Sequence, residues 1–200
     1  VRPFSAHPHR VEKTGYVYNI GTRIGRPNML DVSVLRPDGS AGRVAEIKLP
    51  FGTLIHDFAA TEKHLVVFLA PLELQLFRVL FGMKSFDEGL HWVPEIGTEV
   101  IVIPLDAPAM PVRFHVEAFW AWHVANAFER GGEIVVDLVR HPDFVGTQRW
   151  LSGTSQGHPG AQTDGVLHRL VIDPVRRTLG ETPLRTRTGE FPRIAPHVDA

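Results

Sequence analysis

Short runs of alternating apolar and polar residues, separated by turn signals, limit most strongly what this chain can fold into. Residues 37–39 (PDG) and 129–132 (ERGG) are typical of hairpin turns, because glycine accepts the positive φ that such turns require. The runs predicted as strands are residues 15–20, 29–35, 43–48, 54–58, 64–69, 99–103, 112–116, 119–127, 133–140, 166–172 and 178–183. Many short strands with almost no helix predict an all-β fold of the sandwich, barrel or propeller type. No internal repeat is sharp enough to choose among these three.

Two segments interrupt the strand pattern. Residues 71–86 (PLELQLFRVLFGMKSF) are rich in large apolar side chains and predict a short amphipathic helix. The residues that would share one face of this helix are Leu72, Leu76, Val79, Leu80 and Met83. Residues 152–164 are rich in Gly, Ser and Gln and predict a flexible surface loop.

The composition restricts the chemistry that a functional site can use. A formal net charge of −1, with Lys and Arg spread along the chain, gives no basis for nucleic-acid binding, and we expect none. The chain has no cysteine, which excludes disulfides, zinc–thiolate sites and iron–sulfur clusters. A metal would therefore need His, Asp or Glu, and the chain has 11 histidines. The first residues (VRPF) carry neither an initiator Met nor a signal peptide, so we expect the chain to start within a domain.

Three histidines lie in apolar surroundings where an imidazole needs a partner. They are His7, His56, which follows Leu54-Ile55, and His123 in the run FWAWHVANA. Burying an unpaired polar group costs about 1–3 kcal/mol, and a metal could supply the missing partner. A hydrogen-bonded core histidine is the commoner explanation for each one alone, and the pair His7 and His9 could chelate locally or belong to a plain turn. The spacing of these histidines therefore leaves an all-β domain of unknown function.

Four short segments around these histidines resemble the carotenoid cleavage oxygenases and their retinoid isomerase relatives. Residues 6–9 (AHPH), followed by residues 14–21 (TGYVYNIG), resemble the segment of that family's first metal-binding histidine. Residues 56–62 (HDFAATE) and 123–129 (HVANAFE) resemble the segments of the second and third. Residues 189–194 (GEFPRI) resemble the segment whose glutamate supports a ligand histidine. The segments occur in the family's order and span nearly the whole chain.

The resemblance implies an all-β fold, a partial seven-bladed β-propeller capped by loops and helices that form a substrate tunnel. It implies that His7, His56 and His123 bind Fe(2+) on the propeller axis, and that Glu190 accepts a hydrogen bond from one of them. His9 matches no ligand position. The implied reaction is dioxygenase cleavage: O2 adds to a double bond of an apolar polyene or stilbene-like substrate, which supplies the electrons, and two carbonyl products form.

The chain also departs from the family. Family members are more than twice as long, so residues 1–200 are expected to form an incomplete propeller domain that is inactive alone. The fourth ligand histidine of the family has no counterpart, because His197 follows residues 189–194 too closely. The other glutamates that support ligand histidines are absent as well. We therefore expect a fragment of a longer chain.

The resemblance leaves more than one function open. Carotenoid or apocarotenoid cleavage is the main expectation, with lignostilbene-type cleavage of a short aromatic alkene as the alternative and an isomerohydrolase less favoured. A propeller that serves only as a binding scaffold belongs to a different class. That scaffold predicts no bound iron, and no effect of His56→Ala or His123→Ala beyond stability.

Residues 71–86 lie where family members carry an apolar segment near the tunnel mouth. The side chains expected to dock into a bilayer surface, or to line the tunnel mouth, are Leu76, Phe77, Leu80 and Phe81. An ordinary helix packed on the propeller is an equally favoured interpretation. No transmembrane or targeting segment is visible, which predicts a cytoplasmic or peripheral membrane location.

Two tryptophans neighbour the third histidine. Strand alternation places Trp120 and Trp122 on one face and His123 on the other. This favours packing of both tryptophans between blades, away from the metal, over the alternative that they line the tunnel.

Overall fold

Three antiparallel sheets of four strands each form the main body of the chain, which a computed structural model describes over residues 3–158 and 164–194. The strands of the first sheet are, in spatial order, β1 (His9–Val11), β2 (Tyr16–Arg23), β3 (Asn28–Leu35) and β4 (Ala41–Leu49). Those of the second are β5 (Ala59–Ala60), β6 (His64–Leu69), β9 (Thr98–Pro104) and β10 (Val112–Val116). Those of the third are β11 (Trp120–Arg130), β12 (Glu133–His141), β13 (Val166–Asp173) and β14 (Thr178–Thr188).

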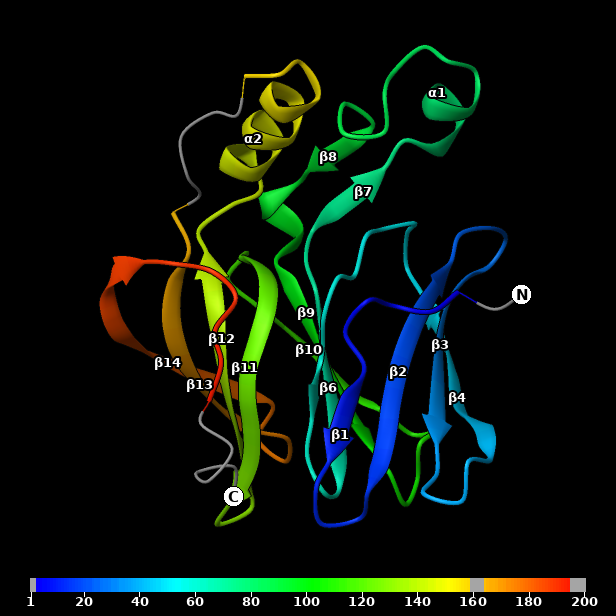
Figure 1. Cartoon of the computed structure of the whole chain (residues 1–200), viewed down its shortest axis with the longest axis vertical. Helices are drawn as coiled ribbons and strands as arrows, with labels where there is room; N and C mark the ends of the chain where they lie inside the picture. Colours follow the sequence, from blue (N-terminus) through cyan, green and yellow to red (C-terminus); the bar gives the residue numbers. More distant parts are fainter. Residues whose placement is uncertain (1–2, 159–163, 195–200) are drawn as a thin grey trace.

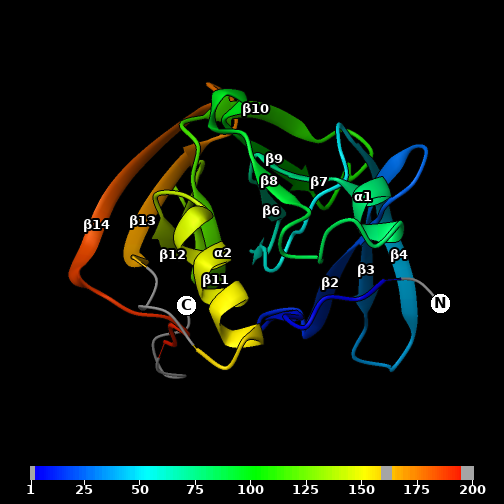
Figure 2. The same cartoon turned by 90° about the horizontal axis from the view of Figure 1, so that it is seen from above.

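The three sheets fan out from a common centre (Figures 1 and 2). The short strand β5 contacts both β1 and β11, so the innermost strands of the sheets meet at that centre. Within each sheet, strands that follow one another in the chain pair outward from the centre. This is the strand arrangement of a β-propeller blade. The prediction of an all-β fold is confirmed, and the three sheets form part of a propeller.

Ten of the eleven predicted strands are present, and residues 112–116 form a strand with the predicted bounds. The prediction of a strand over residues 54–58 is wrong, because these residues are irregular and only the two-residue strand β5 follows them. The Asp57 carboxylate accepts a hydrogen bond from the backbone N–H of Phe58 at 2.8 Å. Such local bonding from a side chain to the backbone competes with the ladder of a strand.

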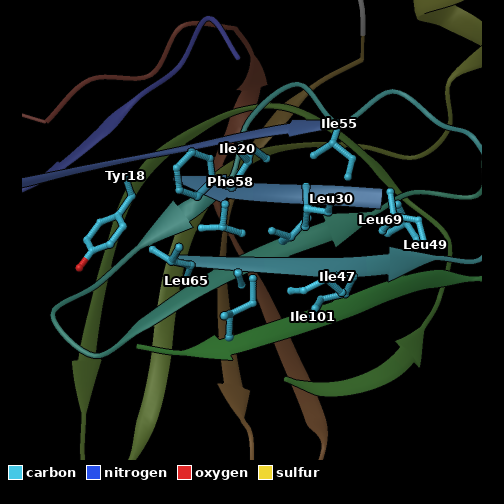
Figure 3. Close-up of a cluster of buried hydrophobic side chains, with 14 of the residues drawn as sticks. Tyr18, Ile20, Leu30, Ile47, Leu49, Ile55, Phe58, Leu65, Leu69 and Ile101 are labelled. Carbon is cyan, nitrogen blue, oxygen red and sulfur yellow. The ribbon is translucent and has the colours of Figure 1, made fainter. Parts of the chain in front are cut away.

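The two central strands of the middle sheet, β6 and β9, are buried on both faces, which is why they are mostly apolar. Leu65, Val67 and Leu69 of β6 belong to a core shared with the first sheet, part of which is drawn in Figure 3. Val66 of the same strand belongs to a second core, shared with the third sheet. Because successive side chains of a strand point to opposite faces, one strand supplies both cores and joins neighbouring blades.

Within residues 71–86 the structure has less helix than the sequence predicts. Leu72–Leu74 form strand β7, which pairs with β8 (Leu90–Trp92), and helix α1 is confined to Leu76–Leu80. The predicted common helical face is therefore absent, because Leu72 is fixed in the hairpin opposite Trp92. No residue of α1 is buried. A single-turn 3₁₀ helix (Pro94–Ile96) precedes β9.

Residues 152–155, predicted as part of a loop, belong instead to helix α2 (Val145–Ser155). The Asp143 carboxylate accepts the backbone N–H of Val145 at 2.8 Å and so supports the first turn. Phe144 and Leu151 join a buried cluster, and this packing outweighs the weak helix propensity of the Gly- and Ser-containing sequence. Residues 159–163 of the predicted loop lie outside the described residues. In the described part of the chain, no helix is long and apolar enough to cross a membrane.

Candidate metal centre

The three histidines selected from the sequence lie on three different blades. His7 precedes β1, His56 precedes β5, and His123 is near the start of β11. Since β5 contacts both β1 and β11, the segments that lead into these innermost strands approach one another. The propeller topology therefore brings together residues that are 49 or more positions apart.

The imidazoles of these histidines converge closely enough to share one metal ion. The Nε2 atoms of His7 and His56 lie 2.9 Å apart. The ring centroid of His123 lies 5.0 Å from that of His7 and 5.3 Å from that of His56, and one nitrogen from each ring lies within 4.8 Å of the others. Ligands about 2.0–2.1 Å from a metal at right angles are about 3 Å apart. These three histidines, called the triad below, are therefore spaced as the ligands of one metal ion are.

The surroundings of His7 and His56 favour neutral imidazoles, whose lone pairs can bind a cation. Burial, reinforced by His7 and His123, lowers the pKa of His56 to about 4. Burial also lowers the pKa of His7, although the Asp57 carboxylate opposes the shift. These two rings are therefore unprotonated at neutral pH.

Glu190 orients the third ring. Its Oε2 lies 2.7 Å from Nδ1 of His123, and its Oε1 lies 2.5 Å from Nε2 of His141. Burial opposes ionisation of this carboxyl, but hydrogen bonds from the two histidines outweigh it and lower the pKa of Glu190 to about 2. An ionised carboxylate only accepts hydrogen bonds, so His123 donates through Nδ1 and keeps Nε2 as a free ligand atom.

Sequence reasoning missed His141. It is the last residue of β12, lies opposite Trp120 across the β11–β12 ladder, and is 2% exposed. Its only sequence signal was a histidine at the end of an apolar strand, which many structural histidines share.

The prediction that Trp122 faces away from the metal is wrong. The β11–β12 register shifts between Ala121 and Val124, so strict alternation fails at this point. The Trp122 ring lies edge-on to that of His56 with centroids 4.6 Å apart, and it borders the same cavity as His123. Trp120 does pack as predicted, buried against Phe144.

Asp57 holds this irregular part of β11. Its Oδ2 accepts the backbone N–H of Val124 at 2.8 Å, while Oδ1 accepts that of Phe58 and lies 2.6 Å from Nε2 of His9. One carboxylate thus ties together the segments that carry His7, His56 and His123. His9 is bound to Asp57 and lies outside the triad, as expected.

A cavity of about 540 Å³ opens in front of the triad. Aromatic side chains form much of its wall: Trp122 from β11, Trp150 from α2 and Phe191 beside Glu190. The Trp122 indole N–H donates to Oγ1 of Thr147 at 3.2 Å, so α2 is tied to the cavity wall. The site is suited to a flat, apolar ligand beside a metal.

The four residues predicted to meet a membrane do not border this cavity. Leu76 is half-buried, whereas Phe77, Leu80 and Phe81 are 63%, 69% and 76% exposed. Helix α1 lies at the same end of the sheets as α2, the helix that borders the cavity (Figure 1).

Comparison with known proteins agrees with these features. A family model described as Retinal pigment epithelial membrane protein matches residues 1–200. Apocarotenoid-15,15'-oxygenase of Synechocystis sp. is 27% identical over 98% of this chain and 41% of its own length. Isoeugenol monooxygenase of Pseudomonas putida is 30% identical over 68% of this chain and 28% of its own length.

Solved structures show the same fold. A cobalt-substituted Synechocystis ACO superposes with a TM-score of 0.78 at 25% identity, over 96% of this chain and 41% of that protein. An ACO/RPE65 chimera gives a TM-score of 0.79 at 24% identity with the same coverage. The chain thus spans less than half the length of these proteins.

Proposed function

Since this chain belongs to the Retinal pigment epithelial membrane protein family, which includes carotenoid cleavage oxygenases, we propose that it contributes most of the metal centre of an iron(II) dioxygenase. The proposed reaction cleaves a carbon–carbon double bond of a carotenoid or apocarotenoid with O2. Both oxygen atoms end in the two carbonyl products, so the reaction needs no external reductant. The observation that carries the proposal is the convergence of three imidazoles on one point.

The donor set fits iron(II). His7, His56 and His123 would hold the ion, because imidazole is a suitable ligand for it and the three rings leave coordination positions open. Bound iron(II) would supply the redox chemistry by which dioxygen reacts with an electron-rich alkene. Glu190 would keep His123 in the tautomer that binds the metal.

The cavity supports an apolar, conjugated substrate. Trp122, Trp150 and Phe191 offer flat aromatic surfaces beside the triad, against which a polyene can stack while water is excluded. The ionised Glu190 carboxylate, which borders the same cavity, is stabilised by hydrogen bonds from His123 and His141 at its two oxygens. These residues would position one double bond next to the metal.

A short aromatic alkene is the second candidate substrate. It is favoured by the 30% identity to isoeugenol monooxygenase, whose name indicates a small phenolic alkene. Incubating the purified full-length protein with a carotenoid, an apocarotenoid, a stilbene and isoeugenol, and identifying the aldehyde products, would separate the two candidates.

Membrane contact is proposed for the α1 segment. Phe77, Leu80 and Phe81 form an exposed apolar group next to the cations Arg78 and Lys84, which suits the surface of a bilayer that holds a lipid-soluble substrate. The absence of any buried residue in α1 supports docking over simple packing on the propeller.

The iron site is tested by metal content and O2-dependent cleavage in the full-length protein. His56→Ala and His123→Ala should each remove bound iron and activity, whereas His115→Ala, an exposed histidine on β10, should change neither. A non-catalytic scaffold predicts instead that the unsubstituted protein binds no iron. It also predicts that all three variants differ only in stability.

A further inference from the structure

Glu190 is shared between two histidines, and only one of them belongs to the triad. Oε2 accepts from His123 at 2.7 Å, and Oε1 accepts from His141 at 2.5 Å. Oε2 also lies at a long 3.4 Å from the backbone N–H of Phe191. Each carboxylate oxygen therefore accepts one strong hydrogen bond, and His141 donates one of these two bonds.

The segment that carries Glu190 is a turn with an unfavourable backbone conformation. It follows the end of β14, and Phe191 has a φ of 54°, which is unfavourable for a residue with a side chain. The Phe191 ring lies on that of His123, with centroids 4.4 Å apart. The contact with His141 lies on the other carboxylate oxygen and helps to hold this turn in one position.

The His141 ring is closely packed on the side that faces Gly165. A Cβ atom on Gly165 would lie 2.4 Å from Cε1 and 2.6 Å from Nε2 of His141, so only glycine fits there. The carbonyl oxygen of the same Gly165 accepts the backbone N–H of Gly189 at 2.9 Å, next to Glu190. Gly165 thus packs against the His141 ring, and it also binds the backbone next to Glu190, whose carboxylate contacts that ring.

We propose that His141 is a positioning residue for the metal centre: it fixes Glu190, which in turn fixes the orientation and tautomer of His123. The proposal rests on the metal site proposed above. The alternative is that His141 is an ordinary buried histidine with a satisfied hydrogen bond, whose loss affects stability alone.

The test is a titration of the metal-free full-length protein with cobalt(II), followed by its visible absorption. His141→Phe keeps a ring but removes the donor to Glu190, and it should weaken cobalt(II) binding about tenfold, the lower end of the effect of outer hydrogen-bond partners. His141→Gln, whose amide N–H can still donate, should recover most of the affinity. Gly165→Ala should displace the ring and weaken binding in the same direction.

Two controls separate positioning from general loss of stability. His168→Phe changes a half-buried histidine on β13 of the same sheet that makes no bond to Glu190. Gly180→Ala adds a methyl group in β14 where nothing lies within 4 Å. Both should bind cobalt(II) as the unsubstituted protein does.

A second readout needs no metal. ¹⁵N NMR of the metal-free protein should show the His123 Nδ1–H proton strongly hydrogen-bonded, and His141→Phe should shift and broaden that signal. If His141→Phe does not fold, the comparison of His141→Gln with Gly165→Ala decides the matter by the same measurements.

The outcomes distinguish the two proposals. Unchanged cobalt(II) affinity and an unchanged His123 signal in His141→Phe would overturn the positioning role while the proposed function stands. An unsubstituted protein that binds no cobalt(II) would overturn the proposed function, and the role of His141 with it.

Discussion

Asp57 offers the sharpest test of how the blades assemble the site. Its side chain is 5% exposed and receives two backbone N–H groups, from Phe58 and Val124, as well as the contact with His9. The substitution Asp57→Asn keeps the shape of the side chain but replaces one acceptor oxygen with an NH2 group.

The expected cost follows from this geometry. If the amide oxygen stays with Phe58 and His9, the NH2 group faces the Val124 N–H, so two donors meet and one buried hydrogen bond is lost. Hydrogen bonds to charged groups contribute about 1.5–3 kcal/mol, so the free energy of unfolding should fall by about 2 kcal/mol. If the amide group is flipped instead, its NH2 group faces the Phe58 N–H, and the hydrogen bond to Phe58 is the one that is lost.

Asp57→Asn should also weaken metal binding. Val124 follows His123, and the Asp57 bond holds the irregular stretch of β11 that turns His123 towards the triad. We therefore expect cobalt(II) affinity to fall about tenfold, in the range found for outer hydrogen-bond partners of metal ligands.

Chemical denaturation of the metal-free protein and cobalt(II) titration measure both effects. The control is Asp38→Asn, which changes an exposed turn carboxylate that accepts the Ser40 N–H. If Asp57→Asn loses no more stability than Asp38→Asn and binds cobalt(II) normally, the reasoning about the blade contact is refuted.

Three further predictions concern pH, substrate and membrane. Because burial lowers the pKa of His56 from 6.5 to about 4, the unfolded chain takes up a proton first. The free energy of unfolding of the metal-free protein should therefore fall as pH drops from about 6.5 to about 4, and His56→Ala should flatten this slope in urea denaturation. Trp122→Phe should raise KM about two- to tenfold in steady-state kinetics, matching an aromatic contact of about 0.5–1.5 kcal/mol, and leave cobalt(II) affinity unchanged. Leu80→Asp and Phe81→Asp should each abolish liposome flotation of the full-length protein. The control Val175→Asp, at a site that is 89% exposed on another blade, should not. Flotation that persists in all three variants contradicts docking through α1.

Local sequence pattern determined most of the strands. In β6 and β9, alternate side chains point into two different cores. Both strands can therefore be predicted from a local pattern that repeats every two residues. The pattern failed where a side chain competes for the backbone, as Asp57 does next to residues 54–58. It failed again where packing outweighs propensity, as in α2.

The sequence alone also named the candidate ligands, but only through its resemblance to a family. The segments around His7, His56 and His123 identified them, and residues 189–194 identified Glu190. The spacing of these residues in the sequence could not identify them, because they come from different blades.

Only the tertiary structure decided which of these side chains meet. The imidazoles converge because innermost strands of adjacent blades contact one another, a relation between residues 49 or more positions apart that no local pattern encodes. The register shift in β11 turned Trp122 towards the cavity, and the path of the chain after β14 brought Glu190 to His141. Strand period is a property of neighbouring residues, whereas a site on a propeller axis depends on how whole blades pack.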